Sequence, residues 1–155
     1  LSNVVIHDYS NKAHGGFLGN SVIGSWCNLG AETSASNLKN TYGEIKMYRA
    51  EIKDYINSGK TFCGLLMGDH SKTAIHTAFD TATVVGAFCN IFGASTPPKH
   101  IPSFSWGGSE GLTEHRLEQA ISTASKVLSR RGLELTPTKE SEIARLFSST
   151  EGERK

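Results

Sequence analysis

Residues 67–95 read MGDHSKTAIHTAFDTATVVGAFCNIFGAS. Every sixth position in this stretch holds a bulky or β-branched residue: Met67, Thr73, Phe79, Val85 and Ile91. Four residues after each comes a small one: Ser71, Thr77, Thr83, Cys89 and Ser95. A period of six matches neither the 3.6-residue period of a helix nor the two-residue alternation of a strand.

This period is typical of a chain that winds as short strands joined by tight corners, the hexapeptide signature of a parallel β-helix. The bulky residues would fill the interior, and the small ones would sit where the chain bends. The same phase occurs earlier at Phe17, Ile23 and Leu29, followed by the small residues Ser21, Cys27 and Thr33. We expect Val5 and Asn11 to continue the phase into a first, irregular coil, and a repeat starting at Ala35 to fail.

The repeat is interrupted between Leu29 and Met67, because their separation of 38 residues is not a multiple of six. Residues 37–63 therefore form an insertion. Apolar residues at 42–48 and 51–56, with turn chemistry at Asn57-Ser58-Gly59, predict a β-hairpin arm or a long loop.

The repeat is expected to stop at Pro97-Pro98, since proline has no amide donor for a ladder. Residues 96–110 would form an exit loop. From Thr113, the predicted N-cap, the spacing predicts an amphipathic helix that ends near Gly132, and Thr136-Pro137 starts a second helix. The predicted organisation is a β-helix at 1–96 with an insertion at about 37–63, followed by an exit loop and helical extension at 97–155.

Composition excludes several classes of protein. The 155 residues carry a net charge of +1, so no basic surplus indicates nucleic acid, and no apolar stretch approaches the ~20 residues that span a bilayer. Cys27 and Cys89 occupy small positions of the repeat and read as buried thiols, which favours a reducing, cytoplasmic compartment. Because the chain begins at Leu1, we expect it to be the C-terminal part of a longer protein.

Residues 12–37 read KAHGGFLGNSVIGSWCNLGAETSASN. They resemble the acetyltransferase half of the bifunctional N-acetylglucosamine-1-phosphate uridylyltransferase/glucosamine-1-phosphate acetyltransferases, where the run is K-x-x-H-x-x-Y-L-G-D-x-x-I-G-x-x-x-N-I-G-A-G-T-x-x-x-N. The resemblance covers roughly residues 4–96. The C-terminal helices look more like a subgroup of sugar nucleotidyltransferases that carry a hexapeptide domain.

The resemblance implies a mainly β fold, a left-handed parallel β-helix, assembled as a homotrimer. It implies a transferase that moves an acetyl group from acetyl-CoA to a sugar phosphate or nucleotide sugar, in the synthesis of cell-envelope precursors. A sugar nucleotidyltransferase domain would precede this chain, and Mg²⁺ would be needed only there. No metal, nucleic acid or membrane is expected as a partner of this part.

The resemblance also assigns site residues. His14 falls on the general base, a role that suits an imidazole because its pKa lies near neutrality. Phe17, Asn28 and Asn37 fall on positions that bind the sugar substrate. The acyl donor would lie along Ala31, Ala74, Ile75, His76 and Gly93.

Five of the departures from the family pattern bear on the site. Phe17 and Leu38 stand for tyrosines, Glu32 for a glycine, Ile75 for a serine and Ser2 for a phosphate-binding lysine. These differences bear mainly on glucosamine-1-phosphate as the acceptor, because another amino or hydroxy sugar could use other contacts. They also motivate a second hypothesis, a non-catalytic domain that trimerises a nucleotidyltransferase and binds a ligand.

His70 and His76 raise the question of a metal site. They stand six apart, at equivalent places in successive repeats. With three repeats per coil they would lie on adjacent faces, so they are not expected to share one metal ion.

Overall fold

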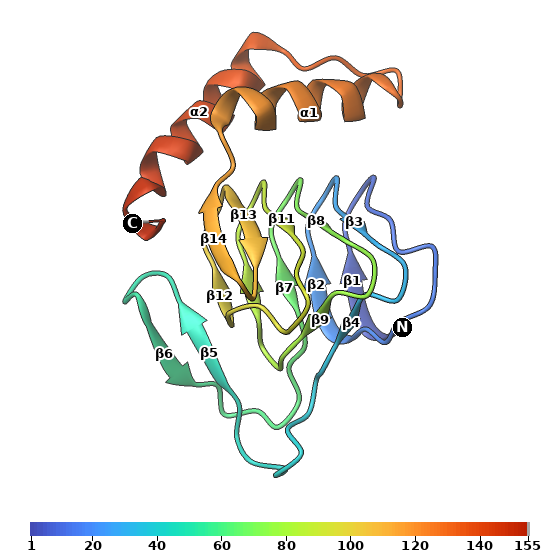
Figure 1. Ribbon diagram of the computed structural model, residues 1–155, viewed down its shortest axis with the longest axis vertical. Helices are drawn as coiled ribbons and strands as arrows, with labels where there is room; N and C mark the ends of the chain where they lie inside the picture. Colours follow the sequence, from blue (N-terminus) through green and yellow to red (C-terminus); the bar gives the residue numbers. More distant parts are fainter. Residues whose placement is uncertain (155) are drawn as a thin grey trace.

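The computed structural model describes residues 1–154, which form a mainly β fold with two helices near the C-terminus (Figure 1). Three sheets enclose one core. Sheet A has the order β1-β2-β7-β10-β12, sheet B has the order β14-β13-β11-β8-β3, and sheet C pairs β4 with β9. Their strands are parallel except that β14 joins β13 in an antiparallel hairpin. The chain visits sheets A, B and C in turn, and one such round is called a circuit below.

The strands are short, as the six-residue period requires. Sheet A contains β1 (Ser2–Ile6), β2 (Gly19–Ile23), β7 (Leu66–Met67), β10 (Val84–Val85) and β12 (His100–Ile101). Sheet B contains β3 (Asn28–Leu29), β8 (Lys72–Thr73), β11 (Asn90–Ile91), β13 (Ser105–Gly108) and β14 (Gly111–Glu114). Sheet C contains β4 (Ser34–Ala35) and β9 (Ala78–Phe79).

The register fixes the length of a circuit. Met67 pairs with Val85, so a regular circuit takes 18 residues, the same interval that joins Ser71 Oγ to the amide of Cys89. Ile23 pairs with Met67 across 44 residues, because the insertion lies within that circuit.

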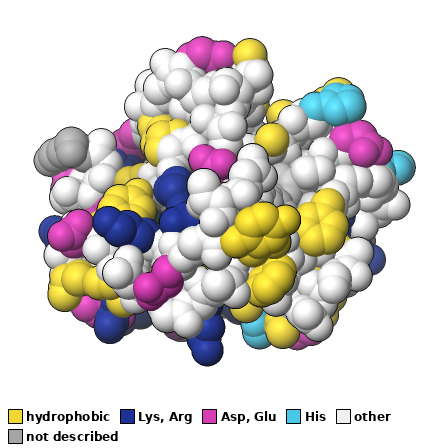
Figure 2. All heavy atoms as spheres, turned by 90° about the horizontal axis from the view of Figure 1, so that it is seen from below, with side chains coloured by type: hydrophobic (Ala, Val, Ile, Leu, Met, Phe, Trp, Pro, Cys, Tyr) yellow, Lys and Arg dark blue, Asp and Glu magenta, His cyan; other side chains and the backbone are white. Residues whose placement is uncertain are grey.

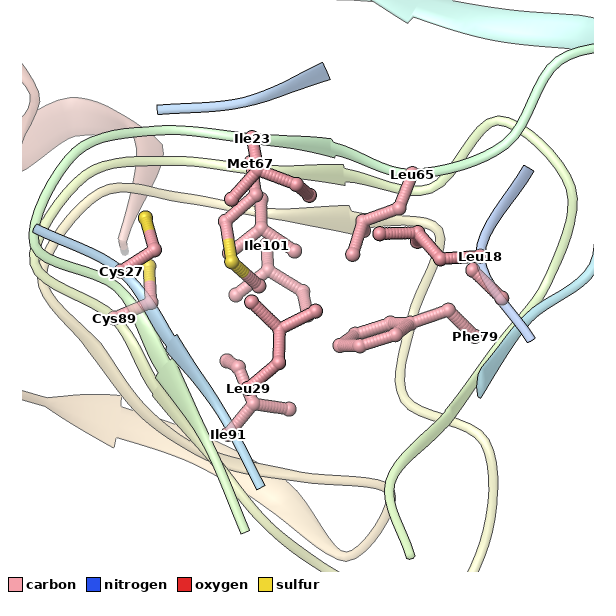
Figure 3. Packing of buried hydrophobic residues seen from close by; sticks show 12 residues of the cluster. Leu18, Ile23, Cys27, Leu29, Leu65, Met67, Phe79, Cys89, Ile91 and Ile101 are labelled. Carbon is pink, nitrogen blue, oxygen red and sulfur yellow. The ribbon is translucent and has the colours of Figure 1, made fainter. Parts of the chain in front are cut away.

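The predicted inward positions from Ile23 to Ile91 are confirmed. Side chains from the three sheets point toward a common centre (Figure 3). The small positions are buried at the bends, where their polar atoms bond to the next circuit: Thr33 Oγ1 lies 2.7 Å from Thr73 Oγ1, and Cys27 Sγ lies 3.2 Å from the Gly68 carbonyl oxygen. Cys27 and Cys89 are free, buried thiols.

The first circuit corrects the sequence prediction. Phe17 and Val5 are 49% and 54% exposed and Asn11 is also exposed, whereas Leu18 is fully buried and Ile6 packs on the core. The reason is the register: Ile6 pairs with Ile23, only 17 residues away. Because this circuit is one residue shorter than the regular circuit, the inward positions move by one residue along the sequence. In a strand, such a shift turns the neighbouring side chain inward.

Two further positions differ from expectation. Ala35 is buried and pairs with Phe79, so the repeat that the sequence rejected is present at its inward position. Ser95 is exposed, and the ladder nevertheless continues past Pro97-Pro98, because β12 pairs with β10 and β13 pairs with β11. The prolines lie in the loop before β12, where no amide is needed for the ladder.

The insertion contains the predicted hairpin. β5 (Lys46–Arg49) and β6 (Asp54–Asn57) pair antiparallel and project from the body of the molecule (Figure 1). The Tyr48 ring stacks on His100 with centroids 3.5 Å apart, which ties the arm back to sheet A. Figure 2 shows the face at the bottom of Figure 1, where charged side chains of both signs are interspersed with hydrophobic ones.

The turn between sheets A and B, the A–B corner, carries a column of stacked rings: Tyr9, Trp26, His70, Phe88 and Phe104. Successive ring centroids lie 4.0, 6.0, 4.6 and 4.9 Å apart. All five residues have φ between 57° and 62°. This left-handed conformation costs an L-residue about 1–2 kcal/mol, and aromatic stacking of about 0.5–1.5 kcal/mol per pair offsets it.

Helices α1 (Leu117–Ser129) and α2 (Pro137–Ser149) lie along this corner rather than across an open end (Figure 1). Ala120, Ala124 and Ile143 pack with Phe88 and Phe104 in a second apolar cluster. Among the residues described, neither helix is long and apolar enough to cross a membrane.

The helix ends agree only in part with the sequence prediction. Thr136 caps α2 by accepting from the Lys139 amide, and Pro137 occupies the first turn, as expected. Thr113 does not cap α1; it lies in β14, and α1 begins after Arg116. The chain after α1 turns at Gly132, whose φ of 69° suits glycine.

Candidate functional site

The turn between sheets B and C, the B–C corner, carries a row of the predicted site residues. Intervals of 17, 44 and 18 residues join successive members of the row, and the same intervals join paired residues of sheet A. The row consists of His14, Ala31, Ile75 and Gly93. It is packed circuit on circuit, since the His76 amide donates to the Ala31 carbonyl oxygen at 2.7 Å.

Small residues keep this corner narrow. A Cβ on Gly30 would lie 2.6 Å from the carbonyl carbon and oxygen of Ala74, so the two circuits touch through their backbones. Ala74, Ile75 and His76 are exposed, Ile75 by 65%. The predicted donor-binding residues therefore form one continuous, solvent-open strip beside His14.

His14 is exposed on a loop that Lys12 holds in place. Lys12 Nζ donates to the carbonyl oxygens of His14 and Gly15 at 3.2 and 2.7 Å. Glu32 covers the next residue: its amide donates to the Gly15 carbonyl oxygen at 3.0 Å, and a Cβ on Gly15 would lie 2.2 Å from Glu32 Oε1. The residue that departs from the family glycine thus places a carboxylate beside the residue that follows the predicted base.

The Phe17 ring and the Asn37 amide lie together beside Gly19. A Cβ on Gly19 would lie 2.6 Å from Phe17 Cζ and 2.8 Å from Asn37 Nδ2. Asn37 Nδ2 donates to Asn20 Oδ1 at 2.7 Å, which fixes the orientation of the amide. Two of the three predicted substrate-binding residues are therefore neighbours.

Asn28 is separate from that pair because it lies on sheet B. Asn11 Nδ2 donates to Asn28 Oδ1 at 3.2 Å. Asn28 opens on a polar cleft of about 530 Å³ between sheet B and the end of α1. Its lining residues are Tyr9, Asn11, Trp26, Cys27, Asn28, Lys72, Val127, Arg130 and Arg131.

His70 and His76 occupy different corners, A–B and B–C. Burial, with Lys72 as a further cause, lowers the pKa of His70 to about 4, so the ring in the aromatic column is neutral. Within residues 1–154, no group of three or more His, Cys, Asp or Glu side chains could hold a metal ion.

Sequence reasoning missed Glu32 as a neighbour of His14, and it missed the aromatic column. The column has a sequence signal: in every third repeat a ring stands directly before the small residue, as in Trp26-Cys27, His70-Ser71 and Phe88-Cys89. Arg130 and Arg131 have no such signal, because their position depends on how α1 docks.

No protein-family model matches the chain. Over 82 residues, 53% of its length, the chain is 35% identical to the Bifunctional protein GlmU of Methanocaldococcus jannaschii. The match covers 19% of that protein, so the chain spans about a fifth of the length of this curated relative. The similarity supports a relationship to a protein of this kind over about half of the chain.

Proposed function

We propose that the chain is a left-handed parallel β-helix whose B–C corner transfers an acetyl group from acetyl-CoA to a sugar phosphate or nucleotide sugar. The observation that carries this proposal is the row formed by His14, Ala31, Ile75 and Gly93. The resemblance assigned these residues to base and donor contacts from separate parts of the chain. The partial match to the Bifunctional protein GlmU supports a transferase-type function.

In this reaction His14 carries out one proton transfer. An amine or hydroxyl of the acceptor attacks the thioester carbonyl while His14 removes its proton, and the carbon–sulfur bond then breaks. The coenzyme leaves as a thiolate and takes up a proton, so the products are an acetylated sugar and a free thiol. An exposed imidazole on a loop anchored by Lys12 is free to approach both substrates.

The strip beside His14 suits the donor. The pantetheine arm of acetyl-CoA is narrow and mostly apolar, with amides that can bond to backbone groups. Ala31, Ala74 and Gly93 leave room for it, Ile75 offers an exposed apolar side chain, and His76 stands at the next position. A second copy of the chain in a homotrimer would supply the opposite wall of the groove.

The wider setting belongs to the proposal as well. The complete protein would be cytoplasmic, would carry a Mg²⁺-dependent sugar nucleotidyltransferase domain, and would make precursors of the cell envelope. The division of the chain into a β-helical part and a helical extension is also part of the proposal.

The test measures thiol release from acetyl-CoA with a panel of amino-sugar phosphates and nucleotide sugars. His14→Ala should lower the rate by at least about 100-fold, a usual contribution of a general base. His7→Ala is the matched control, because His7 is also exposed in the first circuit but lies at the A–B side. Equal rates in His14→Ala and the unmodified protein would remove His14 from the mechanism.

Glu32 favours a second candidate, a trimerisation and ligand-binding domain without chemistry. Its carboxylate lies beside Gly15, at the point where the family has a glycine, and Ile75 replaces a serine on the donor strip. Calorimetry with acetyl-CoA and with desulfo-coenzyme A decides between the two. A trimer that binds neither compound supports the second candidate, and binding of both with turnover supports the first.

A further inference from the structure

The polar cleft beside Asn28 concentrates positive charge. Lys72, Arg130 and Arg131 contribute to its wall, and no Asp or Glu is among the lining residues described for it. Arg130 and Arg131 follow the last residue of α1, so the docking of this helix on the A–B corner brings them to sheet B. Three cations along a cleft of about 530 Å³ suit an anionic ligand.

Within the described residues, no salt bridge neutralises these cations. Among residues 1–154, none of the three side chains takes part in the ion pairs, which are Arg49–Glu51, His100–Glu153 and Arg154–Glu114. Burial lowers the pKa of Lys72, and the charge that opposes this shift is the Cys27 thiol rather than a carboxylate. Lys72 Nζ is held in place by donating to the His70 carbonyl oxygen at 2.9 Å, which leaves further protons for a ligand.

The cleft is within reach of the predicted base. Asn11 and Asn28 line it, and His14 follows Asn11 by three residues, so at most about 10 Å of extended chain separates them. A hexose phosphate is of comparable length. Its phosphate could lie among the cations while its ring rests on the Asn11–Asn28 amide pair and a reacting amine or hydroxyl points to His14.

We propose that this cleft binds the phosphate of the acceptor, with Arg130, Arg131 and Lys72 as the residues that select a phosphorylated sugar. This inference rests on the proposed function. Two arginines suit a dianionic phosphate, because each guanidinium offers two parallel donors to its oxygens. Ser2, where the resemblance expects a phosphate-binding lysine, carries no charge, so the cleft supplies the charge that this position lacks.

A purely structural role for the arginines makes a different prediction. Cations at the C-terminal end of a helix interact favourably with its dipole. If that were their whole role, replacing them would lower the melting temperature and leave phosphate affinity unchanged. Lys126 in the last turn of α1 serves as the matched control, since it is exposed and does not line the cleft.

The first experiment titrates inorganic phosphate and a hexosamine-1-phosphate by calorimetry, with circular dichroism as a check on folding. The Arg130→Gln/Arg131→Gln variant should bind both at least about tenfold more weakly, as the loss of charge-assisted hydrogen bonds requires. Lys126→Gln should bind them as the unmodified protein does. Unchanged affinity in the double variant, or an equal loss in Lys126→Gln, overturns the inference.

Two further measurements distinguish the phosphate of the acceptor from the phosphates of the coenzyme, and distinguish this inference from the proposed function. With desulfo-coenzyme A, the double variant should bind normally; a loss there but not with the sugar phosphate would assign the cleft to the donor and overturn the inference. In turnover, KM for phosphorylated acceptors should rise at least about tenfold with kcat nearly unchanged. A different result is that phosphate affinity falls in the double variant but not in Lys126→Gln, while no acceptor supports thiol release. That result would uphold the anion site and would overturn both its role in binding the acceptor and the proposed function.

Discussion

The A–B corner and the B–C corner make the same left-handed turn, at Trp26 and His70 in one and at Glu32 and His76 in the other. At the A–B corner the side chains are mostly rings that stack from circuit to circuit, and two helices cover them. At the B–C corner no such column forms among the described residues, and the side chains of Glu32, Ile75 and His76 stay exposed. The backbone conformation alone therefore does not decide whether a corner is covered, because the side chains make one corner a packing surface and leave the other open to solvent.

The largest effect on stability is expected at Phe104. This ring is fully buried between Phe88 and Phe147, and the Arg154 guanidinium lies 5.6 Å from its centroid. Phe104→Ala should lower the free energy of unfolding by about 3–5 kcal/mol, since it leaves a cavity under both helices. Ile75→Ala at the B–C corner removes an exposed side chain and should change it by less than about 0.5 kcal/mol. Urea unfolding measures both changes. Equal losses of unfolding free energy would contradict the proposed difference between the two corners.

Sequence and structure agree where the repeat is regular. The six-residue period was enough to predict the inward residues from Ile23 to Ile91 and the presence of an insertion, in which apolar residues and turn chemistry indicated a hairpin or a long loop. It could not reveal the short first circuit, because a one-residue difference becomes visible only when Ile6 is paired with Ile23. The period also could not predict that strand pairing continues after Pro97-Pro98, because the sequence does not distinguish prolines that end a strand from prolines that precede one.

The sequence likewise predicted only part of the candidate site. The motif at residues 12–37 named His14, and the circuit length then places Ala31 and Ile75 in the same row. Glu32 over Gly15 depends on a side-chain conformation, and the cations of the cleft depend on the docking of α1. Neither is encoded in a local spacing.

The next effect concerns acid stability at the A–B corner. His70 is neutral when folded because burial lowers its pKa to about 4 from 6.5, and its buried Nδ1 has no hydrogen-bond partner among residues 1–154. The unfolded chain binds more protons between these values, so stability should fall by as much as about 3 kcal/mol as the pH drops from about 6.5 to 4. The nearby charges are Asp69, which favours protonation, and Lys72 and Lys139, which oppose it.

His70→Phe should remove that part of the acid loss, because phenylalanine already occupies the equivalent position with φ near 60° at Phe88. Denaturant unfolding at a series of pH values measures the slope. His100 also has a pKa lowered by burial, so a shallower slope in the same direction should remain. An unchanged slope in the variant would mean that His70 is not the group that titrates.

A smaller effect is expected where the B–C circuits touch. Gly30→Ala would place a methyl group 2.6 Å from the backbone of Ala74 and Ile75, which cannot rotate away. We expect a loss of about 1–3 kcal/mol in stability and weaker binding of desulfo-coenzyme A, because the donor strip would shift. Gly43→Ala is the control, since its nearest neighbour would be 3.7 Å away. Full stability in Gly30→Ala would show that the circuits can separate without cost.

The smallest effect compares the corners directly, by placing glycine at the same backbone conformation in each. Glu32 has φ of 60° and an exposed side chain, so Glu32→Gly should relieve the left-handed strain and raise the free energy of unfolding by up to about 1 kcal/mol. Trp26→Gly relieves the same strain at φ of 62° but removes a ring stacked 4.0 Å from Tyr9, so stability should fall by at least about 1 kcal/mol. Opposite signs in urea unfolding would locate the difference between the corners in their side chains. Two changes of the same sign would instead assign it to the backbone, and the aromatic column would lose its proposed energetic role.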